Sequence, residues 1–367
     1  MDRRRFLMGT AAGLAALKVM GCQPRDPQAA SDGTPLLRLD SNENPLGLAS
    51  SGREALIEGL GEANRYPGDI YPKLREMLAE GLGISVESLV TSGGSAELLV
   101  MAAAAFSRVE GGTVLQGRPT FLTFSAQAKA RGVTVREFDL AQGHAYPLDA
   151  MRQAAEETEG PVLVYVCNPN NPTGTVISSD AVARWIEEAP EDTWFLIDEA
   201  YHEFVRDERY RTLVAEATQR PRTLVTRTFS KIYAMAGLRI GYGVAHPETA
   251  EQLAGLTQWG NVNHAAACAA MGCYRDDEYL RRSFESNQQA RSILTTALDE
   301  MGLEYLSSQT NFVFHRIPGK VEDHIEKMQE QGVLVGRPFP PLLNWNRVSL
   351  GLPQEMERFV EALKKVV

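Results

Sequence analysis

From about residue 87 onward, short apolar runs alternate with longer amphipathic segments. The short runs are rich in β-branched residues and end at Gly, Asn, Asp or Ser, which is typical of strands. Segments of helix length lie between most of them. Strands that alternate with helices predict an α/β fold, in which helices cover both faces of a mostly parallel sheet. The seven predicted strands are LVTSGG, TVLQG, TVREFD, PVLVYVC, TWFLID, TLVTRTFS and IGYGVA.

After about residue 260 the pattern changes. A long helical stretch leads to the short runs NFVFHRI, GVLVGR and NRVSLG and then to a final helix. This order predicts a smaller α+β domain at the C-terminus. We therefore expect four parts in the chain: an export signal with a spacer (1–30), an N-terminal arm (31–64), a large domain (65–258) and a small domain (259–367).

The first thirty residues have the features of an export signal. A basic cluster, Arg3–Arg5, precedes a run of small apolar residues that is too short for an ordinary transmembrane helix. The letters RRRFL resemble the twin-arginine signal RRxFL. VMGC loosely resembles a lipobox, in which Cys22 would carry a lipid anchor. We expect export to the periplasm or cell envelope, with or without this anchor; a cytoplasmic protein whose first helix starts basic is the alternative.

The charge of the chain and its cysteines and histidines argue against two kinds of ligand. The formal net charge is −10, whereas non-specific binding to nucleic acid needs basic patches that displace counterions. The four cysteines and six histidines show no spacing typical of a zinc site, so we expect no metal. Cys167, Cys268 and Cys273 are expected to be small buried residues. Contact with a membrane is expected only through Cys22.

Polar loops follow several predicted strands, at the edge of the sheet where ligands bind in such folds. SGGSAE, at Ser92–Glu97, opens an apolar helix whose free N–H groups suit a phosphate, although an ordinary turn has the same composition. NPNNPTG, at Asn168–Gly174, is a tightly fixed turn. Its asparagines serve either a ligand or the turn itself.

A carboxylate and a lysine follow two further strands. Asp198 comes directly after TWFLI, where an unpaired anion is unfavourable, so we expect a cation to meet it. Lys231 stands between Ser230 and Arg239 in a stretch with few charges, and it is either a surface charge or an amine held for covalent chemistry. Pyridoxal phosphate requires an amine for its aldehyde, a carboxylate for its ring nitrogen, and hydroxyl, N–H and guanidinium groups for its phosphate. The strand ends together therefore indicate this cofactor.

The motifs NPNNPTG, DEAY, SKIYAMAGLR and NRVSLG resemble those of the fold-type I, class I/II pyridoxal-phosphate aminotransferases. The histidinol-phosphate aminotransferase family is the most similar, and NENPLG, RYP, PTF and GRPF support this match. The resemblance covers residues 36–367 and keeps the family order. It implies a large domain with a mostly parallel seven-stranded sheet, a smaller C-terminal α+β domain and a homodimer.

The resemblance also implies the roles of the catalytic residues. Lys231 would form the Schiff base with the cofactor and then act as the general base. Asp198 would pair with the ring nitrogen. Asn171 and Tyr201 would hydrogen-bond the phenolic oxygen, and Phe121 would stack on the ring, where the family usually has tyrosine.

Further residues would hold the phosphate and the substrate. The expected phosphate ligands are the backbone N–H groups of Ser95 and Ala96, the side chains of Ser230 and Arg239, and Tyr66 from the second subunit. The expected substrate ligands are Arg347, Arg337 and Asn171, because guanidinium pairs well with carboxylate or phosphate.

The activity implied by the resemblance is the reaction of L-histidinol phosphate with 2-oxoglutarate to give imidazole acetol phosphate and L-glutamate. Residues 23–41 contain no tyrosine, whereas some family members place one there near the substrate phosphate. An aromatic or broad amino-acid aminotransferase is therefore one alternative. A decarboxylase such as threonine-phosphate decarboxylase is another, because it shares the same lysine chemistry. A binding protein without catalysis is the non-enzymatic alternative. The sequence leaves the amino donor open.

Overall fold

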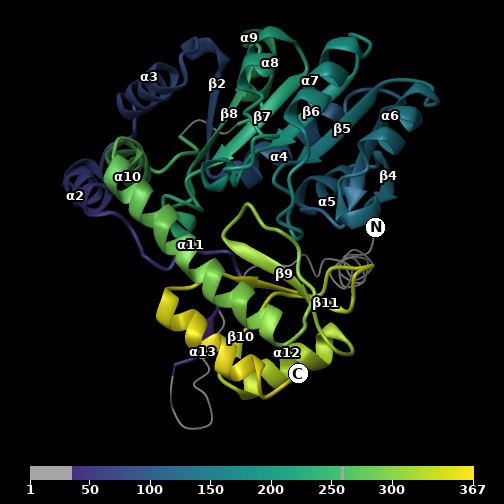
Figure 1. Ribbon diagram of the computed structural model, residues 1–367. Helices are drawn as coiled ribbons and strands as arrows, with labels where there is room; N and C mark the ends of the chain where they lie inside the picture. The colour runs from purple at the N-terminus through teal and green to yellow at the C-terminus, as the bar shows by residue number, and fades with distance from the viewer. Residues whose placement is uncertain (1–34, 258–259) are drawn as a thin grey trace, which may run out of the picture.

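The computed structural model describes residues 35–257 and 260–367, and its centre is a seven-stranded sheet (Figure 1). The strand order is β2-β8-β7-β6-β5-β3-β4. Only β8 runs antiparallel to its neighbours, β2 and β7. The strands are β2 (Leu89–Ser92), β3 (Thr113–Arg118), β4 (Thr134–Asp139), β5 (Val162–Cys167), β6 (Trp194–Asp198), β7 (Thr223–Thr228) and β8 (Gly241–Ala245). All seven predicted strands, and the mostly parallel α/β fold, are confirmed.

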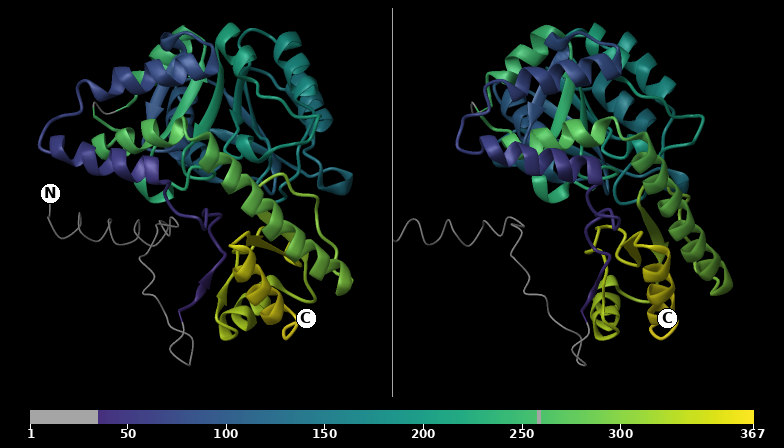
Figure 2. Two further views of the ribbon diagram at one scale, coloured as in Figure 1. Left: turned by 60° about the vertical axis from the view of Figure 1, so that its left-hand side comes forward. Right: turned by 90° about the vertical axis from the view of Figure 1, so that its left-hand side faces the viewer.

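Helices cover both faces of this sheet (Figure 2). Strand β5 shows the reason, because successive side chains of a strand point to opposite faces and all six of its residues are buried. Leu163, Tyr165 and Cys167 belong to one apolar cluster, with α4 (Ser95–Phe106), α5 (Thr123–Ala130) and α9 (Pro247–Ala254). Val164 and Val166 belong to another, with α6 (Leu148–Glu156), α7 (Ser179–Glu188) and α8 (Val214–Gln219).

The last hundred residues form a second, smaller group of elements below the sheet in Figure 1. The long helix α11 (Asp277–Glu300) leads into it, and α13 (Pro353–Leu363) packs against α11. β9 (Phe312–Arg316) pairs antiparallel with β11 (Trp345–Ser349). The group also holds α12 (Val321–Glu330) and β10 (Val333–Leu334), so the predicted combination of helices and short strands is confirmed.

The N-terminal arm connects the two groups of elements. β1 (Leu37–Arg38) pairs with β10 of the smaller group. The chain then passes to α2 (Ser50–Gly59), which packs against α10 (His264–Tyr274). Gly52 allows this contact, since a Cβ there would lie 2.2 Å from the sulfur of Cys273. α3 (Ile70–Leu82) packs against the same helix α10. The arm therefore spans both groups of elements, as Figure 2 shows.

Some predictions fall outside the described residues or need correction. The export signal and Cys22 lie outside them, and so does the predicted domain boundary at residues 258 and 259. In the described part of the chain, no helix is long and apolar enough to cross a membrane. Cys167 and Cys273 are buried as expected, but Cys268 is partly exposed because it lies at the edge of the contact between α2 and α10.

Candidate active site

One cavity of about 640 Å³ collects the predicted site residues at the carboxyl ends of the central strands. Its position follows from the topology, because parallel strands bring the loops after β5, β6 and β7 to the same edge of the sheet. The predicted residues that line it are Ser95, Ala96, Phe121, Asn171, Asp198, Tyr201, Ser230, Lys231, Arg239, Arg337 and Arg347. Sequence reasoning did not assign Asp40, Ser41, Asn42, Cys167 and Thr228, which line it as well.

Lys231 lies in the loop after β7, and its partly exposed side chain lines this cavity. The amine Nζ donates a hydrogen bond to the backbone oxygen of Asn42 at 3.1 Å. It lies 5.6 Å from the centre of the Tyr201 ring. Burial, assisted by the charge of Arg347, lowers the pKa of Lys231 to about 8. An amine inside a cavity with a lowered pKa is suited to covalent chemistry and proton transfer, which favours this role over that of a surface charge.

Asp198 ends β6 and is 2% exposed. Its Oδ1 accepts hydrogen bonds from the backbone N–H of Ala200 at 3.2 Å and from the hydroxyl of Thr226 at 3.3 Å. Its Oδ2 accepts one from the hydroxyl of Tyr165 at 3.3 Å. Burial raises the pKa of Asp198 to about 6, and these hydrogen bonds oppose that effect. The carboxylate is thus held by neutral donors.

The expected cation next to Asp198 is not an arginine of the described residues. Arg227 of β7 instead forms a buried ion pair with Glu199, at 2.8 Å. The reason is the alternation of strand residues, which turns Asp198 toward the cavity and Glu199 and Arg227 toward the other face of the sheet. The carboxylate of Asp198 remains available to a cationic ligand in the cavity.

Tyr201, Asn171 and Asn42 form one hydrogen-bonded group. The side-chain amides of Asn42 and Asn171 both donate to the Tyr201 hydroxyl, at 3.0 and 3.5 Å. Asn42 adopts a positive φ of 54°, which asparagine tolerates better than most residues, and its backbone N–H donates to the hydroxyl of Ser349. Sequence reasoning missed Asn42 as a site residue, although its place in NENPLG was a signal.

The loop before α4 forms a cradle that suits a phosphate. Gly94 has a φ of 100°, and a Cβ there would lie 2.3 Å from the guanidinium of Arg239. A Cβ on Gly241 would lie 2.7 Å from the backbone nitrogen of Ser95. Arg239 donates to the hydroxyl of Ser230 at 3.3 Å. The N-terminus of α4, a hydroxyl and a guanidinium therefore meet where only glycine fits.

Two further arginines line the cavity on the side of the smaller group of elements. Arg347 is 7% exposed and donates to Asn171 Oδ1 at 2.8 Å and to the backbone oxygen of Asp40 at 2.7 Å, but its Nε has no partner. Arg337 and Arg347 lie 4.3 and 5.0 Å from the centre of the Phe339 ring. Neither arginine takes part in the ion pairs found among the described residues. Both can therefore receive an anionic substrate.

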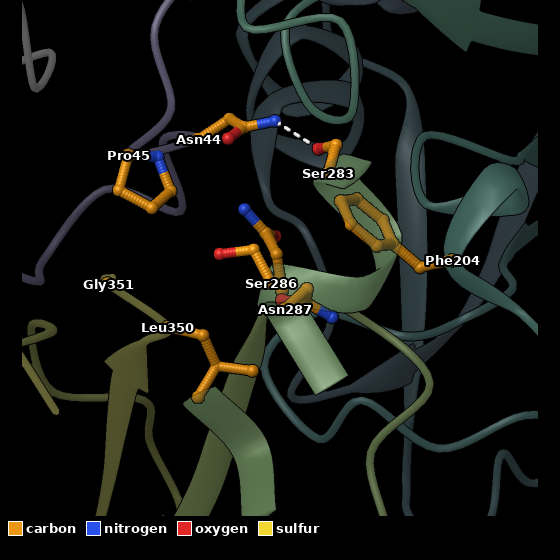
Figure 3. Close-up of a pocket in the computed structure, with 9 residues that line it drawn as sticks. Asn44, Pro45, Phe204, Ser283, Ser286, Asn287, Leu350 and Gly351 are labelled. Atoms are coloured by element: carbon orange, nitrogen blue, oxygen red, sulfur yellow. Dashed lines mark hydrogen bonds between the residues drawn. The ribbon is translucent and has the colours of Figure 1, made fainter. Parts of the chain in front are cut away.

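Tyr66 is the predicted site residue that the structure does not bring into this cavity. It is 81% exposed, in the segment between α2 and α3. A second pocket, shown in Figure 3, lies between the arm, α11 and the smaller group. Its volume of about 10 Å³ is room for one water molecule, so it cannot hold a substrate. Asn44 of this pocket donates to Ser283 and to the backbone oxygen of Ile232, and so supports the loop that carries Lys231.

The cavity fits pyridoxal phosphate on its own chemistry. It presents an amine, a carboxylate held by neutral donors, a phenol with an amide, and a cradle for a phosphate, all expected ligands of this group. In the described part of the chain, no group of three or more His, Cys, Asp or Glu residues is arranged to hold a metal ion.

Comparisons with known proteins agree with this geometry. Residues 34–363 match the family "Aminotransferase class I and II". The chain is 35% identical to histidinol-phosphate aminotransferase 2 of Nitrosospira multiformis, over 89% of this chain and 83% of that protein. It is 36% identical to histidinol-phosphate aminotransferase 2 of Ralstonia nicotianae, over 90% and 89%.

The chain also resembles a solved structure that contains pyridoxal phosphate. Histidinol-phosphate aminotransferase from Sinorhizobium meliloti, in complex with pyridoxal-5'-phosphate, superposes with a TM-score of 0.83 at 25% identity, over 91% of this chain and 92% of that chain. The family match spans nearly all of the described residues and includes every strand that carries the site. The chain therefore belongs to the class I and II aminotransferases, fold-type I enzymes that use pyridoxal phosphate to move an amino group from an amino donor to a 2-oxo acid.

Proposed function

We propose that the protein is a histidinol-phosphate aminotransferase, which converts L-histidinol phosphate and 2-oxoglutarate to imidazole acetol phosphate and L-glutamate. The observation that carries this proposal is the pair of arginines, Arg337 and Arg347, that flank Phe339 without a carboxylate partner among the described residues. Two guanidiniums suit substrates with a phosphate or two carboxylates, and both substrates named here meet that condition. The two relatives described above, both histidinol-phosphate aminotransferases, support the same substrate.

In this proposal each polar residue of the cavity has its own role in the reaction. When bound, pyridoxal phosphate supplies an aldehyde that links to an amine and a ring that accepts electrons from the substrate carbon. Lys231 Nζ takes the proton from that carbon, and its lowered pKa keeps a fraction of the amine neutral near pH 7. Asp198 would stabilise positive charge on the ring nitrogen, while Asn171 and Tyr201 would donate hydrogen bonds to the phenolic oxygen. Arg347 orients the substrate through its anionic group.

A panel of amino donors tests the substrate. Histidinol phosphate, phenylalanine, tyrosine, aspartate and arginine are each offered with 2-oxoglutarate, and glutamate is measured. We expect kcat/KM for histidinol phosphate to exceed that for phenylalanine, tyrosine and arginine by at least about 10²-fold, because these donors carry neither a phosphate nor a second carboxylate for the two guanidiniums; aspartate, which has two carboxylates, should fall between. Arg337→Ala is the matched variant, and it should reduce this preference about tenfold.

The same panel identifies the alternatives. A higher kcat/KM for phenylalanine or tyrosine would replace the proposal with an aromatic aminotransferase, for which the apolar side chains of Phe121, Ile325 and Val335 in the cavity would provide the binding surface. Release of carbon dioxide from threonine phosphate, without formation of glutamate, would assign the protein as a decarboxylase.

The active enzyme is proposed to be a homodimer in which Tyr66 reaches the phosphate cradle of the partner subunit. Support comes from three exposed apolar side chains in one short segment: Ile57 is 61%, Leu60 53% and Tyr66 81% exposed. They are half of the six large exposed hydrophobic residues in the described part of the chain. Such a concentration is typical of a surface that another subunit covers.

Sedimentation of the purified protein tests the dimer. We expect a species of two chains, each of 40.4 kDa if the leader is kept. Leu60→Asp should shift most of it to the monomer, because a carboxylate would be buried in the interface. Leu343→Asp is the control, since Leu343 is also exposed but lies in the smaller group of elements. A wild-type protein that sediments as one chain at micromolar concentration would rule out the dimer.

The chain is also proposed to be exported by the twin-arginine route to the periplasm or cell envelope, with or without a lipid anchor at Cys22. The letters RRRFL and VMGC support this, and the route suits an enzyme that binds its cofactor before it is moved. Replacing Arg3 and Arg4 with lysine should leave most of the protein in the cytoplasm, as measured by cell fractionation. Arg108→Lys, in the exposed turn after α4, is the control. Unchanged export of the double variant would reject this route.

A further inference from the structure

We propose that Tyr165 is a positioning residue of the reaction, whose hydroxyl holds the carboxylate of Asp198 in place and ionised for the ring nitrogen of the cofactor. The inference rests on the proposed role of Asp198 and is independent of which amino donor the enzyme uses. Tyr165 does not line the cavity and was not among the residues indicated by the sequence. It would act only through Asp198.

The geometry of β5 and β6 brings the two side chains together. Cys167 of β5 is the register partner of Asp198, and Tyr165 lies two residues earlier on the same face of β5. The Tyr165 hydroxyl donates to Asp198 Oδ2 at 3.3 Å, while Ala200 and Thr226 donate to Oδ1. Tyr165 is therefore the donor that the structure assigns to the second carboxylate oxygen.

The tyrosine itself is held rigidly. Its side chain is fully buried, and its ring packs against that of Phe124 with the centroids 5.2 Å apart. Its backbone oxygen accepts a hydrogen bond from the hydroxyl of Tyr146 at 2.7 Å. A buried ring with a fixed backbone can aim its hydroxyl at one place, and this place is Asp198. Preorganised donors of this kind need no rearrangement during a reaction.

The ionisation states of Tyr165 and Asp198 decide which of the two donates the hydrogen bond. The titratable groups that face Asp198 are Tyr165 and Cys167 of β5, Tyr201, and Lys231 after β7. Burial raises the pKa of Tyr165 well above its usual value, so the phenol stays protonated and acts as the donor. Asp198 lacks an ion-pair partner among the described residues, so each neutral donor contributes a larger share of its stabilisation.

The test compares Tyr165→Phe with the wild-type holoenzyme. We expect the dissociation constant of pyridoxal phosphate to rise about tenfold and kcat to fall about tenfold, since one hydrogen bond to a charged group is lost. KM for the donor should stay within about twofold, because Tyr165 does not touch the substrate. The titration midpoint of the cofactor's visible absorbance should move upward, because a weaker partner leaves less positive charge on the ring nitrogen.

Tyr279→Phe is the matched control. Tyr279 is a buried tyrosine on α11 that does not line the cavity, and its hydroxyl donates to the backbone oxygen of Gly47 at 2.6 Å. This variant should lower the melting temperature but leave the affinity for pyridoxal phosphate and the absorbance midpoint within about twofold of wild type. Equal effects of the two variants on affinity and midpoint would overturn the proposal, because packing would then explain both.

A double-mutant cycle on the apoenzyme gives a readout apart from activity. Tyr165→Phe should change the melting temperature at pH 7.5 less in the Asp198→Asn background than in the wild type, since the charged acceptor is gone. Tyr165→His, which keeps a ring N–H, should recover part of the cofactor affinity, and it replaces the phenylalanine variant in the cycle if that one does not fold. Additive effects in the cycle, or no recovery by histidine, would contradict the proposal. A failed donor panel with these results intact would affect only the substrate assignment.

Discussion

Replacing Lys231 with alanine is expected to abolish the visible absorbance of the holoenzyme and to lower kcat by at least about 10⁴-fold, since covalent attachment and proton transfer are lost together. The fold should survive this change. Lys231 Nζ donates only to the backbone oxygen of Asn42, and Asn311 donates to that same oxygen at 3.0 Å, so no acceptor loses its last partner. The measurements are the absorbance spectrum and the incorporation of label from borohydride.

Lys129→Ala is the control for this prediction. Lys129 is an exposed lysine on α5 that pairs with Glu137 and does not line the cavity. Its removal should leave spectrum and rate unchanged, because exposed ion pairs contribute little. A chromophore that Lys231→Ala retains, and that borohydride still reduces, would place the covalent link at another lysine.

Most of the fold could be predicted because the sheet is buried on both faces. Strands such as PVLVYVC are continuous apolar runs with clear ends, and they need no information from distant residues. The arm was harder to predict, since β1 consists of two residues and exists only because β10 lies beside it. The boundary predicted between the domains at residue 258 stays a prediction.

The cavity could be predicted where a residue ends a strand or lies in the loop just after one, as Asp198 and Asn171 do. Residues that reach the cavity from a distant part of the sequence could not be predicted. Asn42 precedes Lys231 by 189 positions, and only the folded arm brings its carbonyl to the amine. The cation expected at Asp198 stays a prediction: among the described residues neutral donors hold its carboxylate and Arg227 pairs with Glu199 on the other face, so the cation would have to come from a ligand in the cavity.

Arg347→Ala is expected to lower kcat/KM by about 10²-fold or more while keeping a visible absorbance band that borohydride removes, because Lys231 is still present. The reason is that the guanidinium is buried, lacks a carboxylate partner among the described residues and keeps an unpartnered Nε, so a substrate anion would be its main partner. Losing one side of a buried charged pair has an effect of this size. The kcat/KM of Arg347→Lys should lie between those of Arg347→Ala and the wild type, since an ammonium keeps the charge but not the bidentate geometry.

Arg239→Ala provides the contrast, because this arginine lies beside Ser230 and Gly94 at the other end of the cavity. This variant should lower the affinity for pyridoxal phosphate about tenfold or more and leave KM for the donor nearly unchanged at saturating cofactor. Cofactor affinity and KM are measured for both variants, with histidinol phosphate and with 2-oxoglutarate. The measurements distinguish the site for the cofactor phosphate from the site for the substrate anion. If Arg347→Ala instead weakened the cofactor and spared KM for both substrates, the anion site would have to be reassigned to Arg337, whose partly exposed guanidinium faces the same ring of Phe339.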